Sequence, residues 1–180
     1  MKLPPMSNEV TIRNAKIYAN GIQDSDGQPK SNITLSNLDI ENTGSDGIDT
    51  KEASGDGNQN LVIRDININE VGILDTGTAN GIDIRYTGAT IERVNLVSGP
   101  GAGGPRTAIA FRPGDRVDNA TVSDVYVRGF SNGVQMQGQH SNIAVSDFKV
   151  QGHWGNAVRI LGSNHSGHTL SAGYIDPTSG

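Results

Sequence analysis

Apolar residues recur along the chain as couplets in which one residue separates two apolar side chains. Since successive side chains of a strand point to opposite faces, both members of a couplet point the same way. The couplets return at intervals of roughly 20 to 30 residues, a period typical of stacked structural repeats. They are Val10/Ile12, Ile33/Leu35, Leu61/Ile63, Ala89/Ile91, Ala120/Val122, Ile143/Val145 and, more weakly, His168/Leu170. The repeating unit is therefore built from strands.

Each repeat carries a second and a third couplet in a constant order. A two-residue corner such as Arg64-Asp65 separates the first two couplets, and a longer segment precedes the third. In the repeat that begins at Leu61 the couplets are Leu61/Ile63, Ile66/Ile68 and Ile82/Ile84. A β-sandwich also has short strands but does not keep such an order. The pattern predicts an all-β chain folded as a single-stranded parallel β-helix, with about six to seven coils and three parallel sheets.

Small and amide residues stand where the coil must turn. A Gly or Ala precedes the third couplet, and we expect a tight turn or a positive φ there. These residues are Gly47, Gly81, Ala108, Gly133 and Ala157. Asn32, Asn119 and Asn164 each begin a glycosylation sequon, but Asn also suits the backbone at the entrance to a strand. We interpret these asparagines as turn residues.

Composition fits thin strands joined by polar turns. The chain has 180 residues, of which 34% are hydrophobic and 4% aromatic, and it contains 24 Gly. The repeat runs almost from end to end, so we expect one β-helix domain over residues 1–180. Residues 1–6 and 175–180 carry no strand pattern and look too short to cover the ends of the coil. We therefore expect a piece of a larger parent chain, or a homo-oligomer that covers the coil ends.

Charge and cysteine content exclude several classes of partner and site. The formal net charge is −5 and no basic stripe occurs, which argues against nucleic acid as a partner. No apolar run is long enough to span a membrane, so a membrane partner is not expected. Cysteine is absent, which excludes disulfides and thiolate zinc sites.

The outward positions of the third strand carry the candidate chemistry. Equivalent residues of neighbouring coils lie about 4.8 Å apart, so outward side chains form ladders. Between the two inward positions the ladder reads Asp49, Asp83, Ala110, Gln135 and Arg159, and just after them it reads Lys51, Arg85, Arg112, Gln137 and Leu161. Long segments at 52–59, 69–80, 98–107 and 113–118 enter or leave this strand row. They predict a groove walled by loops, a common place for function.

The repeated strand order, with SDGIDTK at 45–51 and NGIDIR at 80–85, resembles the pectate-lyase-like right-handed parallel β-helix superfamily. That superfamily includes pectate lyases, polygalacturonases, alginate epimerases and phage tailspikes. The segment ENTGSDGIDT at 41–50 is similar to the N-T-D-G segment of polygalacturonases and would make Asp46 a catalytic acid. The three other polygalacturonase motifs are replaced at 80–81, 106–108 and 132–135. The resemblance therefore implies β-elimination rather than hydrolysis.

The resemblance also implies roles for individual residues. In pectate lyases, acidic side chains hold calcium, which neutralises the substrate carboxylate, and an Arg or Lys acts as the base. By this likeness Asp49 and Asp83 are candidate calcium ligands. The candidate catalytic residues are Asp46, Asp83, Arg85 and Arg112, and the candidate substrate-binding residues are Lys51, Trp154 and Arg159. Trp154 is included not by the resemblance but because a lone aromatic residue can stack on a sugar ring, and filling a coil corner is an equal alternative for it. The base would need a proton affinity lowered by crowded cations. The implied ligand is an acidic polysaccharide, and the implied location is extracellular or on a virion surface.

A non-catalytic function stays open. Outward charged ladders can simply solvate a sheet, with each ion pair contributing about 0 to 1 kcal/mol. The chain would then be a glycan-binding or structural shaft of a phage tail spike or a surface adhesin. His140, His153, His165 and His168 lie near coil corners without metal-site spacing, and we interpret them as surface histidines.

Overall fold

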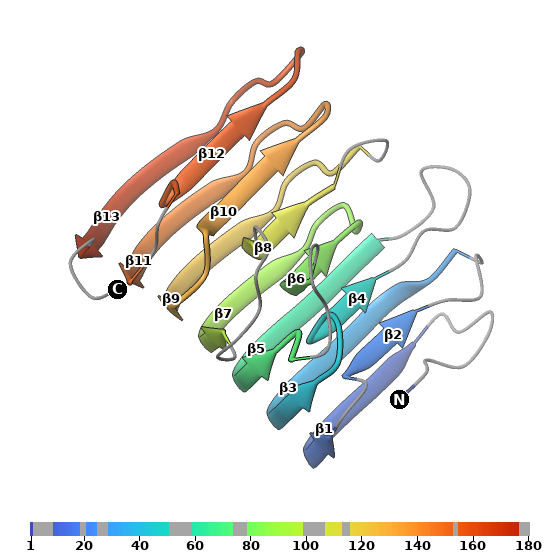
Figure 1. Cartoon of the computed structure of the whole chain (residues 1–180). Coiled ribbons are helices and arrows are strands. Elements are labelled where there is room, and N and C mark those ends of the chain that lie inside the picture. The colour runs from blue at the N-terminus through green and yellow to red at the C-terminus, as the bar shows by residue number, and fades with distance from the viewer. Residues whose placement is uncertain are drawn as a thin grey trace.

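The computed structural model describes residues 1, 9–18, 21–24, 29–50, 59–73, 79–98, 107–112, 116–152 and 155–176. All regular elements in these ranges are strands, and neighbouring strands pair in parallel (Figure 1). They stack as a solenoid of about five turns, slightly fewer than the pattern predicts. The predicted all-β, parallel coiled architecture is confirmed. No helix in the described ranges is long and apolar enough to cross a membrane.

Long and short strands form two separate sheets. The long-strand sheet has seven strands in the order β1-β3-β5-β7-β9-β11-β13. These are β1 (Val10–Tyr18), β3 (Ser31–Thr43), β5 (Gln59–Val71), β7 (Thr90–Ser98), β9 (Thr121–Arg128), β11 (Ala144–Gln151) and β13 (Thr169–Asp176). The short-strand sheet has six strands in the order β12-β10-β8-β6-β4-β2. These are β2 (Ile22–Asp24), β4 (Ile48–Thr50), β6 (Asn80–Ile84), β8 (Thr107–Phe111), β10 (Asn132–Gln137) and β12 (Val158–Leu161).

The prediction of three sheets is wrong, because the first two couplets of each repeat belong to one bent strand. Pairing between β5 and β7 continues across the corner, from Arg64↔Glu92 to Ile66↔Val94. The residue at each bend adopts a positive φ, which Asn and Asp tolerate better than most residues. The bend residues are Asn14, Asn37, Asp65, Arg93, Asp124, Asp147 and Ala172. A single left-handed residue thus turns the chain without ending the sheet.

Inward couplet residues stack into continuous apolar rows. One row runs Leu35, Ile63 and Ile91 through the pairings of β3, β5 and β7, and all three side chains are fully buried. Short-strand residues such as Ile82 and Ile109 complete the core from the other sheet. Burial of these branched side chains is the main stabilising contribution to the solenoid.

Glycine before the third couplet is required by close packing rather than by a positive φ. A Cβ built at Gly81 would lie 2.5 Å from the carbonyl oxygen of Ala108, and one at Gly133 would lie 2.4 Å from that of Ala157. Neither glycine is among the residues of positive φ. Successive coils therefore approach here more closely than a side chain ordinarily permits.

Asparagines at strand entrances do adopt left-handed backbone geometry. The φ angles of Asn32, Asn119 and Asn164 are 56°, 57° and 65°. Two of them also bond to asparagines of the next coil: Asn60 Nδ2 donates to Asn32 Oδ1 at 3.0 Å, and Asn142 Nδ2 donates to Asn119 Oδ1 at 3.1 Å. The backbone interpretation of these sequon asparagines is confirmed.

One histidine, His140, departs from the expected surface location, whereas His165 and His168 are partly exposed. His140 is 1% exposed, and Val117 N–H donates to its Nδ1 at 3.2 Å. Ile143 N–H donates to His168 Nδ1, which leaves His168 Nε2 to donate to His165 Nδ1 at 3.2 Å. With Nε2 of His140 and of His165 facing the carbonyl oxygens of Gln137 and Leu161, all three rings are satisfied as neutral Nε2–H tautomers. His153 lies outside the described residues.

We expect acid to weaken this histidine network. Burial lowers the pKa of His140 and of His168 below the ordinary 6.5. A lowered folded-state pKa means that the stability contribution is present above pH 6.5 and is lost as the pH falls below that value. His140→Gln keeps one acceptor and one donor without titrating. The denaturant midpoint of His140→Gln should fall less than that of the wild type between about pH 7 and pH 5. An equal fall of the midpoint in both proteins would contradict a role of the histidine network in acid sensitivity.

Candidate functional site

The outward carboxylates of the short-strand sheet stand in vertical register. Asp49 of β4 pairs with Asp83 of β6, which pairs with Ala110 of β8. The predicted ladder is therefore confirmed for these coils. Although they point away from the core, Asp49 and Asp83 are only 3% and 1% exposed. Buried carboxylates at outward positions mark this part of the sheet as more than a solvated surface.

Three carboxylates and two guanidinium groups converge at this register. Oxygen atoms of Asp46, Asp49 and Asp83 lie within 4.8 Å of one another. Arg112 Nε donates to Asp83 Oδ2 at 2.5 Å, and Arg85 Nε lies 3.6 Å from Asp83 Oδ1. We call these five residues the carboxylate–arginine cluster. The structure thus brings together all the predicted catalytic residues and both predicted calcium ligands.

Asp46 is held by a backbone hydrogen bond to the next coil. Its Oδ1 accepts from Asn80 N–H at 2.5 Å. Three coils beyond Asp46, Asn132 Oδ1 accepts from Asn156 N–H in the same way. An Asn or Asp before the small residue of the third strand therefore forms a second side-chain ladder. The repeated Asp46-Gly47 and Asn80-Gly81 dipeptides carried this signal in the sequence.

Burial and crowding shift the titration of Asp46. Burial raises its pKa from 3.8 to about 7, and repulsion by Asp49 and Asp83 adds to the rise. The hydrogen bond from Asn80 and the charge of Arg112 oppose it. Asp46 thus exchanges its proton near neutral pH, as general acids and bases do.

Arg112 and Asp83 form a strongly coupled pair. Burial lowers the pKa of Arg112, but the Asp83 carboxylate outweighs this and holds the pKa above the ordinary value. Burial also raises the pKa of Asp83, against the two neighbouring guanidinium groups. The direction found for Arg112 is opposite to the lowering expected for a base. Arg112 therefore fits a charge clamp for a carboxylate, and Asp46 fits proton transfer better.

Thr50, which the sequence pattern does not mark, fixes the geometry of the cluster, and Asn80 contacts the cluster through Asp46. Thr50 Oγ1 donates to the carbonyl oxygen of Asp83 at 2.7 Å and accepts from Arg85 N–H at 3.0 Å. It thereby ties the end of β4 to the strand that carries Asp83. Asn80 is 5% exposed, and its Nδ2 has no hydrogen-bond partner among the described residues. The pattern of apolar couplets gives no signal for Thr50, because its side chain is small and polar.

The cluster contains an oxygen suited to a hard cation. Asp83 Oδ1 is buried and accepts no hydrogen bond from the described residues, and the carboxylates of Asp46 and Asp49 lie beside it. Calcium is bound by carboxylate oxygens at about 2.3 to 2.6 Å, so oxygens within 4.8 Å of one another can share one ion. The donor set therefore fits Ca²⁺.

The remaining predicted residues do not join the cluster. Arg159 occupies the same ladder as Asp83, but Ala110 and Gln135 stand between them, and Arg159 is exposed. Lys51 and Trp154 lie outside the described residues. The same is true of most of the loops expected to wall the groove, at 51–58, 74–78, 99–106 and 113–115.

Comparison with known proteins identifies no relative of this chain. Models of protein families, curated proteins and solved structures were each compared with the chain, and none matches.

Proposed function

We propose that this chain is a carbohydrate-active β-helix that binds an acidic polysaccharide over the short-strand sheet and cleaves it by β-elimination. The observation that carries the proposal is the carboxylate–arginine cluster, in which buried carboxylates and guanidinium groups meet on an outward face. Membership of the pectate-lyase-like superfamily, and a place outside the cell or on a virion, are parts of the same proposal. They are supported by the parallel solenoid together with the segments at 45–51 and 80–85.

β-Elimination requires two kinds of group, and the cluster offers both. A base removes the proton next to the substrate carboxylate, a carbon–carbon double bond forms, and the glycosidic oxygen leaves with the electrons of its bond. With a pKa of about 7, Asp46 is a stronger base than an ordinary carboxylate. Arg112 and Arg85 place positive charge where the substrate carboxylate would become more negative.

Calcium fits the same arrangement. Asp49 and Asp83 would hold the ion through oxygens that include Asp83 Oδ1, which accepts no hydrogen bond but lies 3.6 Å from Arg85 Nε. Asp83 Oδ2 would keep its hydrogen bond to Arg112. When bound, Ca²⁺ would supply charge neutralisation at the substrate carboxylate. The protein residues would still bind the sugar acid and carry the proton.

A non-catalytic function is the second candidate, and the hydrogen bonds of the cluster favour it. Asp83 pairs with Arg112, and Asp46 accepts from the backbone of the next coil, so both carboxylates have a structural use. A rigid glycan-binding shaft needs no more than a sheet face held together by such ion pairs and hydrogen bonds.

Incubation with pectate, alginate and a glycosaminoglycan, with Ca²⁺ or with a chelator, separates the candidates. We expect ultraviolet absorbance from new double bonds with one of these substrates, and a slower rise in the chelator. Reducing ends without absorbance would indicate hydrolysis instead. No absorbance and no reducing ends on any substrate would overturn the enzymatic proposal.

A further inference from the structure

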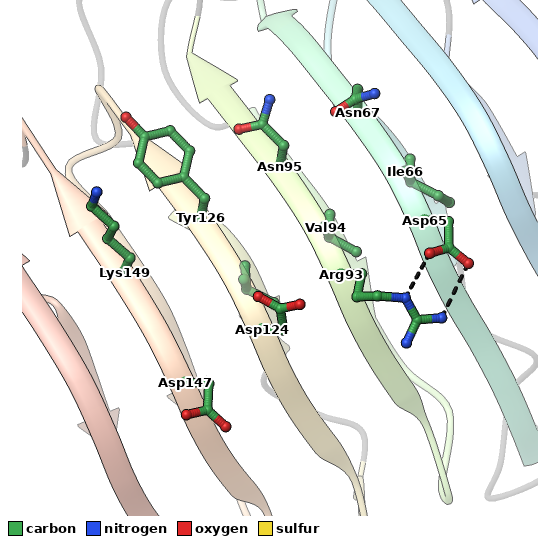
Figure 2. A pocket seen from close by; sticks show the side chains of 11 residues that line it. Asp65, Ile66, Asn67, Arg93, Val94, Asn95, Asp124, Tyr126, Asp147 and Lys149 are labelled. Carbon is green, nitrogen blue, oxygen red and sulfur yellow. Dashed lines mark hydrogen bonds and ion pairs between the residues drawn. The ribbon is translucent and has the colours of Figure 1, made fainter.

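A second groove lies on the outward side of the long-strand sheet, where the strands bend. Figure 2 shows its side chains on neighbouring strands of that sheet. The groove has a volume of about 500 Å³, within the range of small-molecule sites. It spans β5, β7, β9 and β11, and none of its lining residues belongs to the carboxylate–arginine cluster.

Charged residues at the bends form one wall. Arg93 donates to both carboxylate oxygens of Asp65, at 2.6 and 3.1 Å, which closes that end of the wall. On the next two strands, Asp124 and Asp147 have no hydrogen bond or ion pair within the described part of the chain, and Figure 2 shows both without a partner. Two carboxylates at neighbouring bends are therefore available as acceptors.

Outward residues after the bends form the other wall. Asn67, Asn95, Tyr126 and Lys149 follow one another in register across the four strands. The Lys149 ammonium lies 5.4 Å from the centre of the Tyr126 ring. Asn95 Oδ1 is buried and accepts no hydrogen bond from the described residues, so the outward part of this amide is its Nδ2 donor. This wall offers amide and ammonium donors beside an aromatic ring.

We propose that this groove binds a neutral oligosaccharide whose chain runs along the solenoid axis. Each sugar hydroxyl both donates and accepts, which matches free carboxylates on one wall and amide and ammonium donors on the other. Tyr126 adds an amphipathic surface for a sugar ring. The lining holds three carboxylates and two cations, so it would repel a polyanion. Its groups repeat every coil, about 4.8 Å, close to the length of one pyranose unit.

Titration with neutral hexasaccharides of β-1,4-glucan, α-1,4-glucan and β-1,4-mannan, followed by calorimetry, tests the proposal. At least one should bind with a Kd of about 1 mM or tighter. Tyr126→Ala and the double change Asp124→Asn with Asp147→Asn should each weaken that binding about tenfold. Tyr18→Ala removes an exposed tyrosine of β1 outside the groove and should leave it unchanged. Asp83→Asn should also leave it unchanged, since the cluster lies on the other sheet.

Three results would overturn the proposal. The first is that no neutral hexasaccharide binds. The second is that one binds but is insensitive to both Tyr126→Ala and the double Asp change. The third is that hexagalacturonate binds more tightly than every neutral sugar and loses affinity with Lys149→Ala, which would make the groove a polyanion site.

Discussion

Asp83→Asn is expected to reduce cleavage of the acidic polysaccharide by about a hundredfold or more. Asn fills the same volume but cannot carry the charge that orients Arg112 at 2.5 Å and Arg85 at 3.6 Å. It also removes one of the two proposed calcium ligands. The Asp83 side chain is 1% exposed, so the change alters the centre of the cluster and not its rim.

Folding should survive this change. Arg112 and Arg85 keep 34% and 19% of their side-chain surface exposed, so both can turn toward water when their partner is lost. Far-ultraviolet circular dichroism checks the fold, and initial rates of absorbance increase measure turnover. Gln135→Ala is the matched control, because Gln135 occupies the same ladder two coils away and should retain turnover. Unchanged turnover in Asp83→Asn would show that the reaction occurs elsewhere.

The register of the cluster could be predicted from the sequence, and its burial could not. Alternation places Ile48 and Ile82 inside, which forces Asp49 and Asp83 outward, and a constant repeat order stacks them. Alternation says which way a side chain points but not what packs above it. The 3% exposure of Asp49 is therefore a tertiary property that no period in the sequence contains.

Two further errors have physical causes of the same kind. The pattern predicts that a strand ends at the Arg64-Asp65 corner, yet one positive φ at Asp65 lets hydrogen bonding resume at Ile66. The spacing of His140 fits no metal site and therefore predicts a surface residue, but its two ring nitrogens form hydrogen bonds with backbone groups of Val117 and Gln137. Polar residues that pair with the backbone leave no trace in a hydrophobic pattern.

Asp46 links the fold and the proposed chemistry, since it serves the side-chain ladder and also titrates near pH 7. The equivalent ladder residues in other coils are Asn80 and Asn132. Asparagine at position 46 would keep an oxygen to accept from Asn80 N–H and would remove the charge beside Asp49 and Asp83. A carboxylate at this position is therefore unnecessary for the ladder, which favours a functional reason for it.

Asp46→Asn is expected to stabilise the protein at alkaline pH in the absence of calcium. A folded-state pKa of about 7 against 3.8 means that stability falls as pH rises from 3.8 to 7, and the loss is complete above that range. At about 1.4 kcal/mol for each pKa unit, the variant should exceed the wild type by up to about 4 kcal/mol at pH 8 and match it near pH 4, by urea unfolding.

Calcium should reduce the advantage of the variant, because only the wild type keeps the Asp46 carboxylate beside the two proposed ligands. The Tm of the wild type should rise with added Ca²⁺ at pH 8 more than that of Asp46→Asn, whereas Mg²⁺, which demands a smaller and stricter shell, should shift both less. If the variant were instead less stable than the wild type at pH 8 without calcium, Asp46 would be a structural partner of Arg112. The Asp46 carboxylate would then have a structural role in the sheet and not a catalytic one.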